Sequence, residues 1–421
     1  MRLATKSLVA AGAACTVLLA GCSSSSDGGG SAGGGEDGAL SGEVTMWIYP
    51  IIADEAAHTG FWDAQVAAFT EENPDVDVTV QVYPWAGRDE SLTTAIASGT
   101  GPDVVYLIPD QLATYQSSIE PVDDYLSAEH VADILPNVAD SITVDGQMLG
   151  SPLLTSSNPL VCDKAAFDAI GATEYPATWD DLLDLAPDLA EQGIYATNYW
   201  GSPEVTLNMT FYPLLWQAGG DVFSEDGTSV AFNSDAGVEA LEFLVELNEG
   251  GYLEPDLITT TPSIEQTALA QNKVACTWQS GPADVESYWG EENIVIQPPL
   301  TQEETVGYGT VGSLSMLKGS ENKAAAGAWI DFVTSADPVT EFVTTAKMFS
   351  PLSSTGELYA DDPVYGAIEQ TIPDTTVGPV NEHAREVMGV LAPEIQAALL
   401  GQKSAQEALD DAAASADAML G

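Results

Sequence analysis

The feature that most constrains the fold is an alternation of β-rich and helical segments over residues 43–108. Residues 60–70 and 91–98 place apolar side chains at helical spacing. The segments that flank and separate them have the composition of strands: 43–49, 76–83 and 103–108. This order predicts a parallel sheet covered by helices. A ligand crevice is expected at the carboxyl ends of such strands, where loops begin at Tyr49, Tyr83 and Ile108.

The second half of the chain also mixes strands and helices, so the fold class is α/β. The predicted strands are 159–163, 273–278 and 293–297. The predicted helices are 178–190, 211–218, 235–248, 324–334, 338–348, 383–400 and 404–420. A length of 421 residues is enough for two or three domains.

The charge of the chain excludes several partners. It has 64 Asp and Glu against 10 Lys and Arg, a formal net charge of −54. A nucleic-acid binder needs clustered basic residues to neutralise phosphates, and the few here are scattered. The same scarcity argues against docking on anionic lipid through a basic patch. Such acidity keeps a protein soluble and fits a saline habitat or an acidic proteome.

The first segment predicts the compartment. Arg2 and Lys6 precede an apolar run over 7–20 that is too short to span a membrane. The run ends in Leu-Ala-Gly-Cys at Cys22, which resembles the lipobox of bacterial lipoproteins. The resemblance implies a signal peptide over 1–21 and a lipid on Cys22. The alternative is an ordinary signal peptide with a coincidental cysteine.

Residues 22–42 then read as the lipid anchor and a flexible Ser/Gly tether, because 23–42 is almost all small and polar. The protein is expected on the extracytoplasmic face of the cell membrane, held by this anchor. Two cysteines remain, Cys162 and Cys276, which could form a disulfide or stay as two buried thiols. No Cys/His spacing suggests a metal site, and no cofactor is predicted.

Six short motifs then occur in a fixed order: Ala97-Ser98-Gly99 with Pro102-Asp103-Val104; Asp145-Gly146 with residues 152–164; PATWDDL at 176–182; residues 218–233; LAQNKVACTWQSG at 269–281; and GQKSAQEAL at 401–409. In this order they resemble the substrate-binding lipoproteins of bacterial ABC importers, in the carbohydrate-uptake class that includes the maltose-binding protein. The resemblance runs from about Glu43 to the C-terminus.

The resemblance implies a two-lobe, type II periplasmic-binding-protein-like fold with hinge crossovers and a ligand cleft. The first lobe would comprise 43–154 plus 312–335, and the second 155–311 plus 336–421, with the C-terminal helices. Lobes of this kind close around a ligand by hinge motion, and an importer recognises the closed form. The implied partners are a neutral sugar or oligosaccharide and the permease subunits of an ABC transporter. The protein is expected to be a monomer.

A sugar presents apolar C–H faces and a rim of hydroxyl groups, so its site needs aromatic plates, carboxylates and amides. Asp110 matches an aspartate that contacts sugar in the maltose-binding member. Ala283 stands where the family usually has a tryptophan, so one common plate is missing. The predicted ligand-binding residues are Tyr49, Trp85, Asp110, Ser156, Asn158, Trp200, Glu204, Trp278, Asp284, Ser313 and Asn381.

Structural roles are predicted for several other residues. Trp216 and Trp329 lie in helical patterns and are expected in cores. Arg88 is read as a surface or ion-pair residue, and Arg385 could close one end of the cleft with Asn381. The family places Cys162 and Cys276 on strands of the second lobe, where they replace its usual Tyr and Met. A paired departure of this kind suggests a cross-link.

Two alternatives to an ABC importer receptor stay open. A secreted carbohydrate-active enzyme would use two carboxylates across a cleft, but 64 acidic residues guarantee chance pairs. No HExxH, GxSxG, Walker or Rossmann motif is present, and no catalytic residue is predicted. The other alternative is a receptor for another small solute, such as a polyol, a glycerophosphodiester or a peptide.

Overall fold

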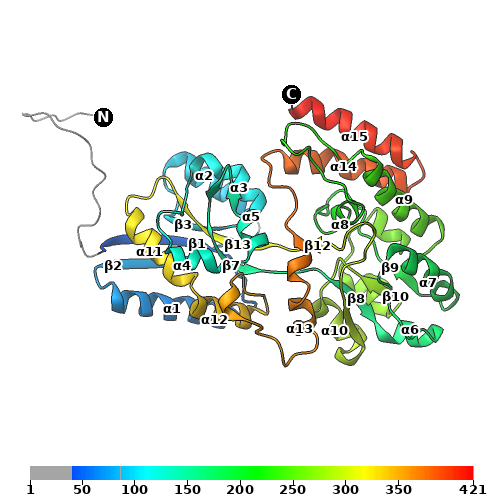
Figure 1. The fold of residues 1–421 in the computed structure, drawn as a ribbon, viewed down its shortest axis with the longest axis horizontal. Helices are drawn as coiled ribbons and strands as arrows, with labels where there is room; N and C mark the ends of the chain where they lie inside the picture. The colour runs from blue at the N-terminus through cyan, green and yellow to red at the C-terminus, as the bar shows by residue number, and fades with distance from the viewer. Residues whose placement is uncertain (1–39, 86, 421) are drawn as a thin grey trace, which may run out of the picture. The chain divides into compact units, whose positions relative to one another are not determined.

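The computed structural model describes residues 40–85 and 87–420. The predicted signal peptide, Cys22 and nearly all of the tether lie outside these residues. Within them, the chain forms two larger sheets, of six and four strands, and two two-stranded sheets. Each larger sheet packs in its own hydrophobic core. Figure 1 shows the helices that surround each sheet. No helix among the described residues is long and apolar enough to cross a membrane.

The first sheet has the order β2-β1-β3-β13-β4, and β7 pairs with β13. The strand β1 is parallel to β2 and β3, as the strand–helix alternation predicts. The strand β13 returns from far along the chain and is antiparallel to β3, so the sheet is mixed. Its strands are β1 (Gly42–Ile48), β2 (Val76–Val82), β3 (Val104–Leu107), β4 (Ile119–Glu120), β7 (Ser151–Thr155) and β13 (Val311–Leu317).

The helices of the first core include one that begins earlier than predicted. The helix α1 begins after Asp54, whose carboxylate accepts a hydrogen bond from Ala57 N, and Asp54 is therefore its N-cap. Trp62 on α1 and Trp329 on α11 are buried in this core. The helices are α1 (Glu55–Glu72), α2 (Arg88–Ser98), α3 (Pro109–Tyr115), α4 (Ala128–Asp133), α5 (Pro136–Ser141), α11 (Lys323–Val333) and α12 (Ala336–Ala346).

One part of the expected division of the chain is wrong. Residues 336–421 were assigned to the second lobe, but α12 packs in the first core. Val339, Phe342 and Val343 are buried there, and the Phe342 ring centroid lies 5.6 Å from that of Trp62. The chain therefore returns to the second core after α12, not before it.

The second sheet has the order β11-β8-β10-β9. The strands β9 and β10 are parallel, whereas β8 is antiparallel to both β10 and β11. Thr178 is the N-cap of α7 as predicted, and it shares a capping box with Asp181. The strands are β8 (Leu160–Asp163), β9 (Tyr195–Thr197), β10 (Val274–Thr277) and β11 (Ile294–Gln297).

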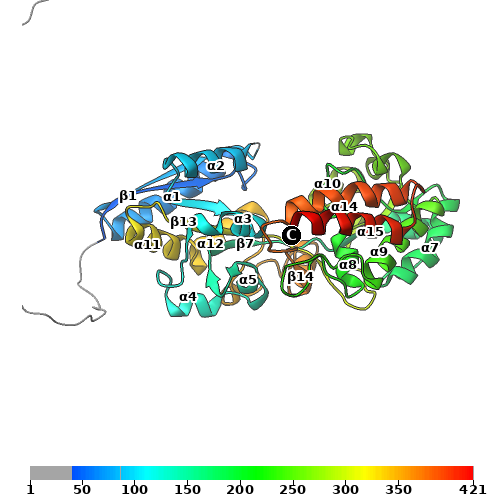
Figure 2. The ribbon, with the colours of Figure 1, turned by 90° about the horizontal axis from the view of Figure 1, so that it is seen from above.

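The helices α14 and α15 lie side by side in the second core (Figure 2). The helices of this half are α6 (Lys164–Ile170), α7 (Trp179–Glu191), α8 (Tyr212–Gln217), α9 (Asp235–Glu249), α10 (Pro282–Trp289), α13 (Tyr365–Glu369), α14 (Ala384–Leu399) and α15 (Ala405–Leu420). The shortest strand pair of the first half is β5 (Thr143–Val144) with β6 (Gln147–Met148). Short 3-10 turns occur at 116–118, 255–258, 264–266, 269–271, 291–293, 353–355 and 372–374.

Three chain segments run together where the two halves connect. Residues 156–158 lead from β7 to β8, β12 (Gly307–Tyr308) leads toward β13, and β14 (Thr375–Thr376) pairs with β12. Backbone hydrogen bonds tie the first two segments together, from Ser156 N to Thr310 O and from Asn158 N to Tyr308 O. A Cβ at Gly309 would lie 2.3 Å from Ser156 O, so only glycine allows this close crossing.

Candidate functional site

The topology brings the predicted site loops to one edge of the first sheet. The strands β1, β2 and β3 are parallel, so their carboxyl ends lie at the same edge. Thr155 at the end of β7 pairs with Val311 at the start of β13, and both belong to this edge as well. The crossover segments therefore join the first sheet at the edge that carries Tyr49, Trp85 and Asp110.

The corresponding edge of the second sheet carries the ends of β9 and β10. Thr277 at the end of β10 pairs with Val161 near the start of β8, so the crossover enters at this edge. Cys276 pairs with Thr197 in the parallel ladder, so β9 ends there too. The crossovers thus link the two edges at which a crevice is expected in sheets of this kind.

An aromatic platform stands at the first edge. The rings of Tyr49 and Trp85 are stacked with their centroids 5.0 Å apart, and Tyr106 meets both edge-on at 6.2 and 6.3 Å. Tyr49 and Tyr106 are buried, whereas Trp85 is 43% exposed. The Arg88 guanidinium lies 5.2 Å from the Trp85 centroid and 5.7 Å from that of Tyr49.

The buried side of this platform is packed against the first sheet. The Tyr106 hydroxyl packs against Gly312, where a Cβ would lie 1.9 Å from the hydroxyl oxygen. Burial raises the pKa of Tyr49 to about 12 and also raises that of Tyr106. Both hydroxyl groups are therefore neutral donors at neutral pH. The sequence predicts Tyr49 and Trp85 as site residues but not Tyr106. It predicts Arg88 to be a surface or ion-pair residue.

Asp110 lies beside the platform, in the first turn of α3. Its two carboxylate oxygens differ in their hydrogen-bond partners. Its Oδ2 accepts a hydrogen bond from Arg385 Nε at 2.9 Å, and Arg385 Nη2 lies 2.8 Å from the same oxygen in an ion pair. Its Oδ1 is buried and has no hydrogen-bond partner among the described residues. Asp89 on α2 also faces Arg385, at 3.5 Å from Nη1. An ion pair therefore orients Asp110 through one carboxylate oxygen and leaves the other oxygen without a partner among the described residues.

The predicted site residues of the crossover segments mainly make structural contacts. Ser156 Oγ accepts a hydrogen bond from Thr310 N, while Asn158 lines a small enclosed cavity with Trp278 and Tyr308. The prediction for Ser313 is wrong, because this residue is fully buried within β13 and its hydroxyl donates to Leu107 O. The return crossover expected over residues 309–313 is shorter than that, because β13 begins at Val311 and carries Ser313 into the first sheet.

The predicted site residues of the second half also include both accessible and buried side chains. Trp200 is partly exposed, and its backbone N–H donates to Gln279 Oε1. Glu204 is exposed, and its backbone N–H donates to Ser202 Oγ. Trp278 is buried in the core, and its indole N–H donates to Thr210 O. Trp278 therefore does not offer the open stacking face that was expected of it.

Two further predicted residues hold the backbone near helix starts, Asp284 as part of a capping box and Asn381 in the turn before α14. Asp284 lies at the third position of α10, and its carboxylate accepts a hydrogen bond from Gly281 N at 2.9 Å. Asn381 Oδ1 accepts from His383 N at the start of α14, and its Nδ2 donates to Gly227 O. Asn381 also lines a surface cavity of about 340 Å³ with Ala113 of α3. The capping box explains the position of Asp284, whereas Asn381 lies at the edge of this surface cavity.

Two side-chain amides at the second edge have buried polar atoms without partners among the described residues, and so does Tyr212 at the start of α8. Both side-chain atoms of Asn198 and the Nε2 of Gln279 have no hydrogen-bond partner among the described residues, and neither has the Tyr212 hydroxyl. Burial raises the pKa of Tyr212, so its hydroxyl keeps its proton. The sequence reading missed all three residues. Of the three, only Gln279 directly follows a strand that the sequence predicts, residues 273–278.

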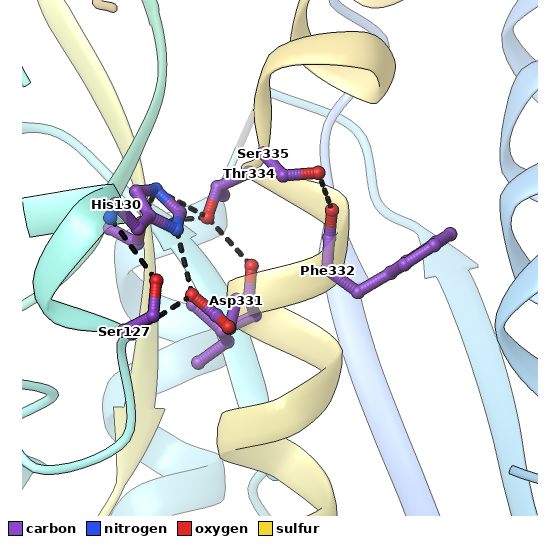
Figure 3. A network of polar contacts seen from close by, with 8 residues as sticks. Ser127, His130, Asp331, Phe332, Thr334 and Ser335 are labelled. Carbon is purple, nitrogen blue, oxygen red and sulfur yellow. Dashed lines mark hydrogen bonds and ion pairs between the residues drawn. The ribbon is translucent and has the colours of Figure 1, made fainter. Parts of the chain in front are cut away.

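A larger surface cavity, about 460 Å³, lies elsewhere on the first core, beside His130. Figure 3 shows His130 Nδ1 against Asp331 Oδ1, at 2.8 Å. Ser151 Oγ lies 3.4 Å from His130 Nε2, which places a carboxylate, an imidazole and a hydroxyl in sequence. Ser151, however, is fully buried and shares its hydrogen bond with Thr334. The cluster fixes α4 to α11 and offers no nucleophile to a substrate.

The two cysteines face each other on neighbouring strands. Cys162 of β8 pairs in register with Cys276 of β10, and a disulfide joins them with an S–S distance of 2.03 Å. Both lie in the core of the second sheet. In the described part of the chain, no group of three or more His, Cys, Asp or Glu side chains is placed to hold a metal ion.

Two α/β cores joined by crossing segments, with a platform and unpaired polar groups at the joined edges, define a protein of the type II periplasmic-binding-protein class. Solved structures share this fold. The cyclic α-maltosyl-1,6-maltose binding protein from Arthrobacter globiformis has a TM-score of 0.78 and 21% identity, covering 90% of this chain and 99% of that one. An ABC transporter solute-binding protein from Thermotoga lettingae, bound with α-D-tagatose, has a TM-score of 0.73 and 24% identity, covering 90% and 100%.

The chain belongs to the bacterial extracellular solute-binding protein family, whose sequence profile matches residues 53–339. A Brucella abortus protein named as a binding protein is 26% identical over 392 residues, which cover 90% of this chain and 94% of that relative. The predicted fold and the family resemblance are therefore confirmed. The relatives found are named as binding proteins.

Proposed function

We propose that this protein is the substrate-binding component of an ABC transporter, and that it captures a neutral sugar or oligosaccharide between its two lobes for delivery to the permease subunits. The supporting observation is the Tyr49–Trp85 platform beside the unpaired Oδ1 of Asp110. An exposed aromatic face removes the apolar C–H face of a sugar from water. A buried carboxylate oxygen without a donor is costly unless a ligand hydroxyl supplies one.

A neutral ligand suits the charges at this site. Arg385 is already neutralised by Asp110 and Asp89, and Arg88 lies over two aromatic rings. Arg88 could still receive an anionic solute, so the alternative ligands include glycerophosphodiesters as well as polyols and peptides. We propose a binding function without catalysis, and the support is that the relatives found are named as binding proteins.

A thermal-shift screen tests this proposal. The panel consists of glucose, maltose, maltotriose, trehalose, sucrose, lactose and raffinose, together with glycerol, glycerophosphocholine and a tripeptide. A ligand that binds only the folded state stabilises it by about 2.7 kcal/mol at 100 times its Kd. We expect at least one sugar to raise the Tm. A shift with only a non-sugar solute would contradict the sugar assignment, and hydrolysis products after incubation would indicate an enzyme.

We further propose that Cys22 carries a lipid that holds the protein on the extracytoplasmic face of the membrane. The support is the lipobox-like Leu-Ala-Gly-Cys and the Ser/Gly tether behind it. A Cys22→Ala variant should be released into the medium. If the variant remains in the membrane fraction to the wild-type extent, the anchor is not at Cys22. Sedimentation of the released protein should show a monomer.

A further inference from the structure

The amide of Asn198 is buried and unmatched. The residue is only 1% exposed, yet neither its Oδ1 nor its Nδ2 has a hydrogen-bond partner among the described residues. Burying an amide without partners is unfavourable, and such groups are rare in native structures. A buried amide with two unmatched atoms is therefore expected to meet a group that comes from outside the protein.

Gln279 presents a second unmatched amide at the same edge. Its Oε1 accepts the hydrogen bond from Trp200 N at 2.9 Å, which fixes the side chain. Its Nε2 is left buried without a partner in the described part of the chain. The free N–H group is therefore a donor whose direction the protein has already set.

The strand register brings these two amides together. The strands β9 and β10 are parallel and pair Thr197 with Cys276. Asn198 is one residue beyond the end of β9, and Gln279 is two residues beyond the end of β10. This is the edge at which the crossover from the first sheet enters, because Thr277 pairs with Val161.

We propose that Asn198 and Gln279 form the polar wall of the second lobe and bind hydroxyl groups of a neutral, polyhydroxylated ligand. This inference rests on the proposed function and adds to it the residues that read the ligand from the second lobe. Asn198 supplies one acceptor and one donor, and Gln279 supplies a donor. Asp110 on the first lobe supplies only an acceptor.

The two walls therefore make different demands on the ligand. A ligand hydroxyl at Asp110 must donate, whereas a pair of neighbouring hydroxyls at Asn198 can donate to Oδ1 and accept from Nδ2. Adjacent hydroxyl groups on a sugar ring meet this requirement. A fully deprotonated anion does not, because it cannot donate a hydrogen bond to Asn198 Oδ1.

The variant Asn198→Leu tests the proposal, with the panel sugar that gives the largest thermal shift as the probe. We expect its affinity in calorimetry to fall at least tenfold. The Tm of the ligand-free variant should stay equal to that of the wild type or rise, because the substitution removes a buried group that has no partner. A residue with a purely structural role would lower the Tm and leave the affinity unchanged.

Asn248→Leu is the matched control in the same core. The Asn248 Nδ2 donates to Leu399 O at 2.7 Å, so its amide has a structural partner. This variant should lose stability and keep wild-type affinity. If Asn198→Leu behaves like Asn248→Leu, the proposal is overturned.

Gln279→Glu provides a second test that does not depend on the folding of Asn198→Leu. It keeps the oxygen that accepts from Trp200 N and replaces the free donor with an acceptor. We expect a loss of affinity of tenfold or more, and wild-type affinity would contradict the proposal. The screen on the wild type distinguishes a failure of this proposal from a failure of the proposed function. If no panel sugar binds the wild type, the proposed function itself fails.

Discussion

At the scale of single residues, exposure separates tryptophans that can meet a ligand from those that hold a core. Trp85 is 43% exposed and stacks on Tyr49, whereas Trp329 is fully buried against Met46. We expect Trp85→Ala to weaken sugar binding by about 2 kcal/mol, roughly thirty-fold, by analogy with aromatic anchors at interfaces. Trp329→Ala should lower the free energy of unfolding by about 3–5 kcal/mol.

Calorimetric affinity and Tm for both variants provide the measurement. The contrast carries the prediction, because a general loss of fold would lower both quantities. If Trp85→Ala keeps wild-type affinity, the platform is not the stacking surface.

A second residue-level prediction compares two aspartates that the sequence treats alike. Asp110 has an unpaired buried oxygen at the site, whereas Asp284 caps α10. Asp110→Asn replaces an acceptor and breaks the pair with Arg385, so we expect binding to weaken by about 1–3 kcal/mol. Asp284→Asn should leave affinity unchanged in the same calorimetric titration. Equal effects would show that the site has been placed wrongly.

His58 gives a prediction for pH. Its Nε2 accepts from the Trp62 indole N–H at 3.2 Å, and burial lowers the pKa of His58 below its usual value of about 6.5. Below pH 6.5 the unfolded chain therefore takes up a proton that the folded protein resists. The contribution of His58 to stability should be complete above pH 6.5 and should decrease as the pH falls through that value.

The variant His58→Gln isolates this effect from the many carboxylates, which titrate in both proteins. The difference in free energy of unfolding between wild type and variant should shift against the wild type between pH 7.5 and 5.5. Urea titrations at several pH values measure it. A difference that stays constant over this range would rule out a neutral buried imidazole.

Single residues also show what the sequence can and cannot predict of the site. Tyr49, Trp85 and Asp110 were predicted because each follows a strand, and strand ends can be recognised locally. Gln279 also follows a predicted strand and Asn198 does not, but neither could be selected, because an unmatched amide is defined by the absence of partners from distant segments. The link from Arg385 to Asp110 likewise spans 275 residues and needs the folded chain.

At the scale of elements, the disulfide between β8 and β10 closes a loop, since its cysteines are 114 residues apart. Loop closure of this length restricts the unfolded chain, so we expect reduction or a Cys162→Ser/Cys276→Ser double variant to cost about 2–5 kcal/mol of stability. Thiol titration of the unfolded, unreduced protein with Cys22 replaced should detect no thiol from these two positions.

The double variant is the matched control for that titration, because it lacks both thiols in every condition. Two titratable thiols in the unreduced protein would show that the cysteines are unpaired. If no thiol titrates and the free energy of unfolding is unchanged after reduction, the bond is present but does not stabilise the fold.

Elements were predicted well where their pattern is local and poorly where pairing is remote. The strands at 42–48 and 76–82 and the capped helix after Thr178 were recognised from composition and caps. The strand β13 was missed because its burial comes from β3 and β7, far away in the chain. The helix α12 was placed in the wrong core for the same reason: its apolar face does not specify which core covers it.

At the scale of the whole molecule, the two-core architecture could be inferred from the order of the motifs, and the charge adds a property that no element shows. The formal net charge of −54 is distributed over a chain with only 10 basic residues. Ion pairs such as Lys323–Glu120 and Lys164–Asp168 neutralise few of the carboxylates. The folded protein therefore brings many like charges closer together than the unfolded chain does.

Salt should consequently stabilise this protein. The Debye length falls from about 30 Å at 0.01 M to about 3 Å at 1 M ionic strength, which screens repulsion between surface carboxylates. We expect the Tm at pH 7.5 to rise between 0.01 and 1 M NaCl in differential scanning calorimetry. The same comparison at pH 4 is the control, because Asp and Glu carboxyls are then partly protonated and less repulsion remains to be screened. A Tm that falls with salt at pH 7.5, or an equal rise at both pH values, would mean that carboxylate repulsion does not limit the stability of the folded chain.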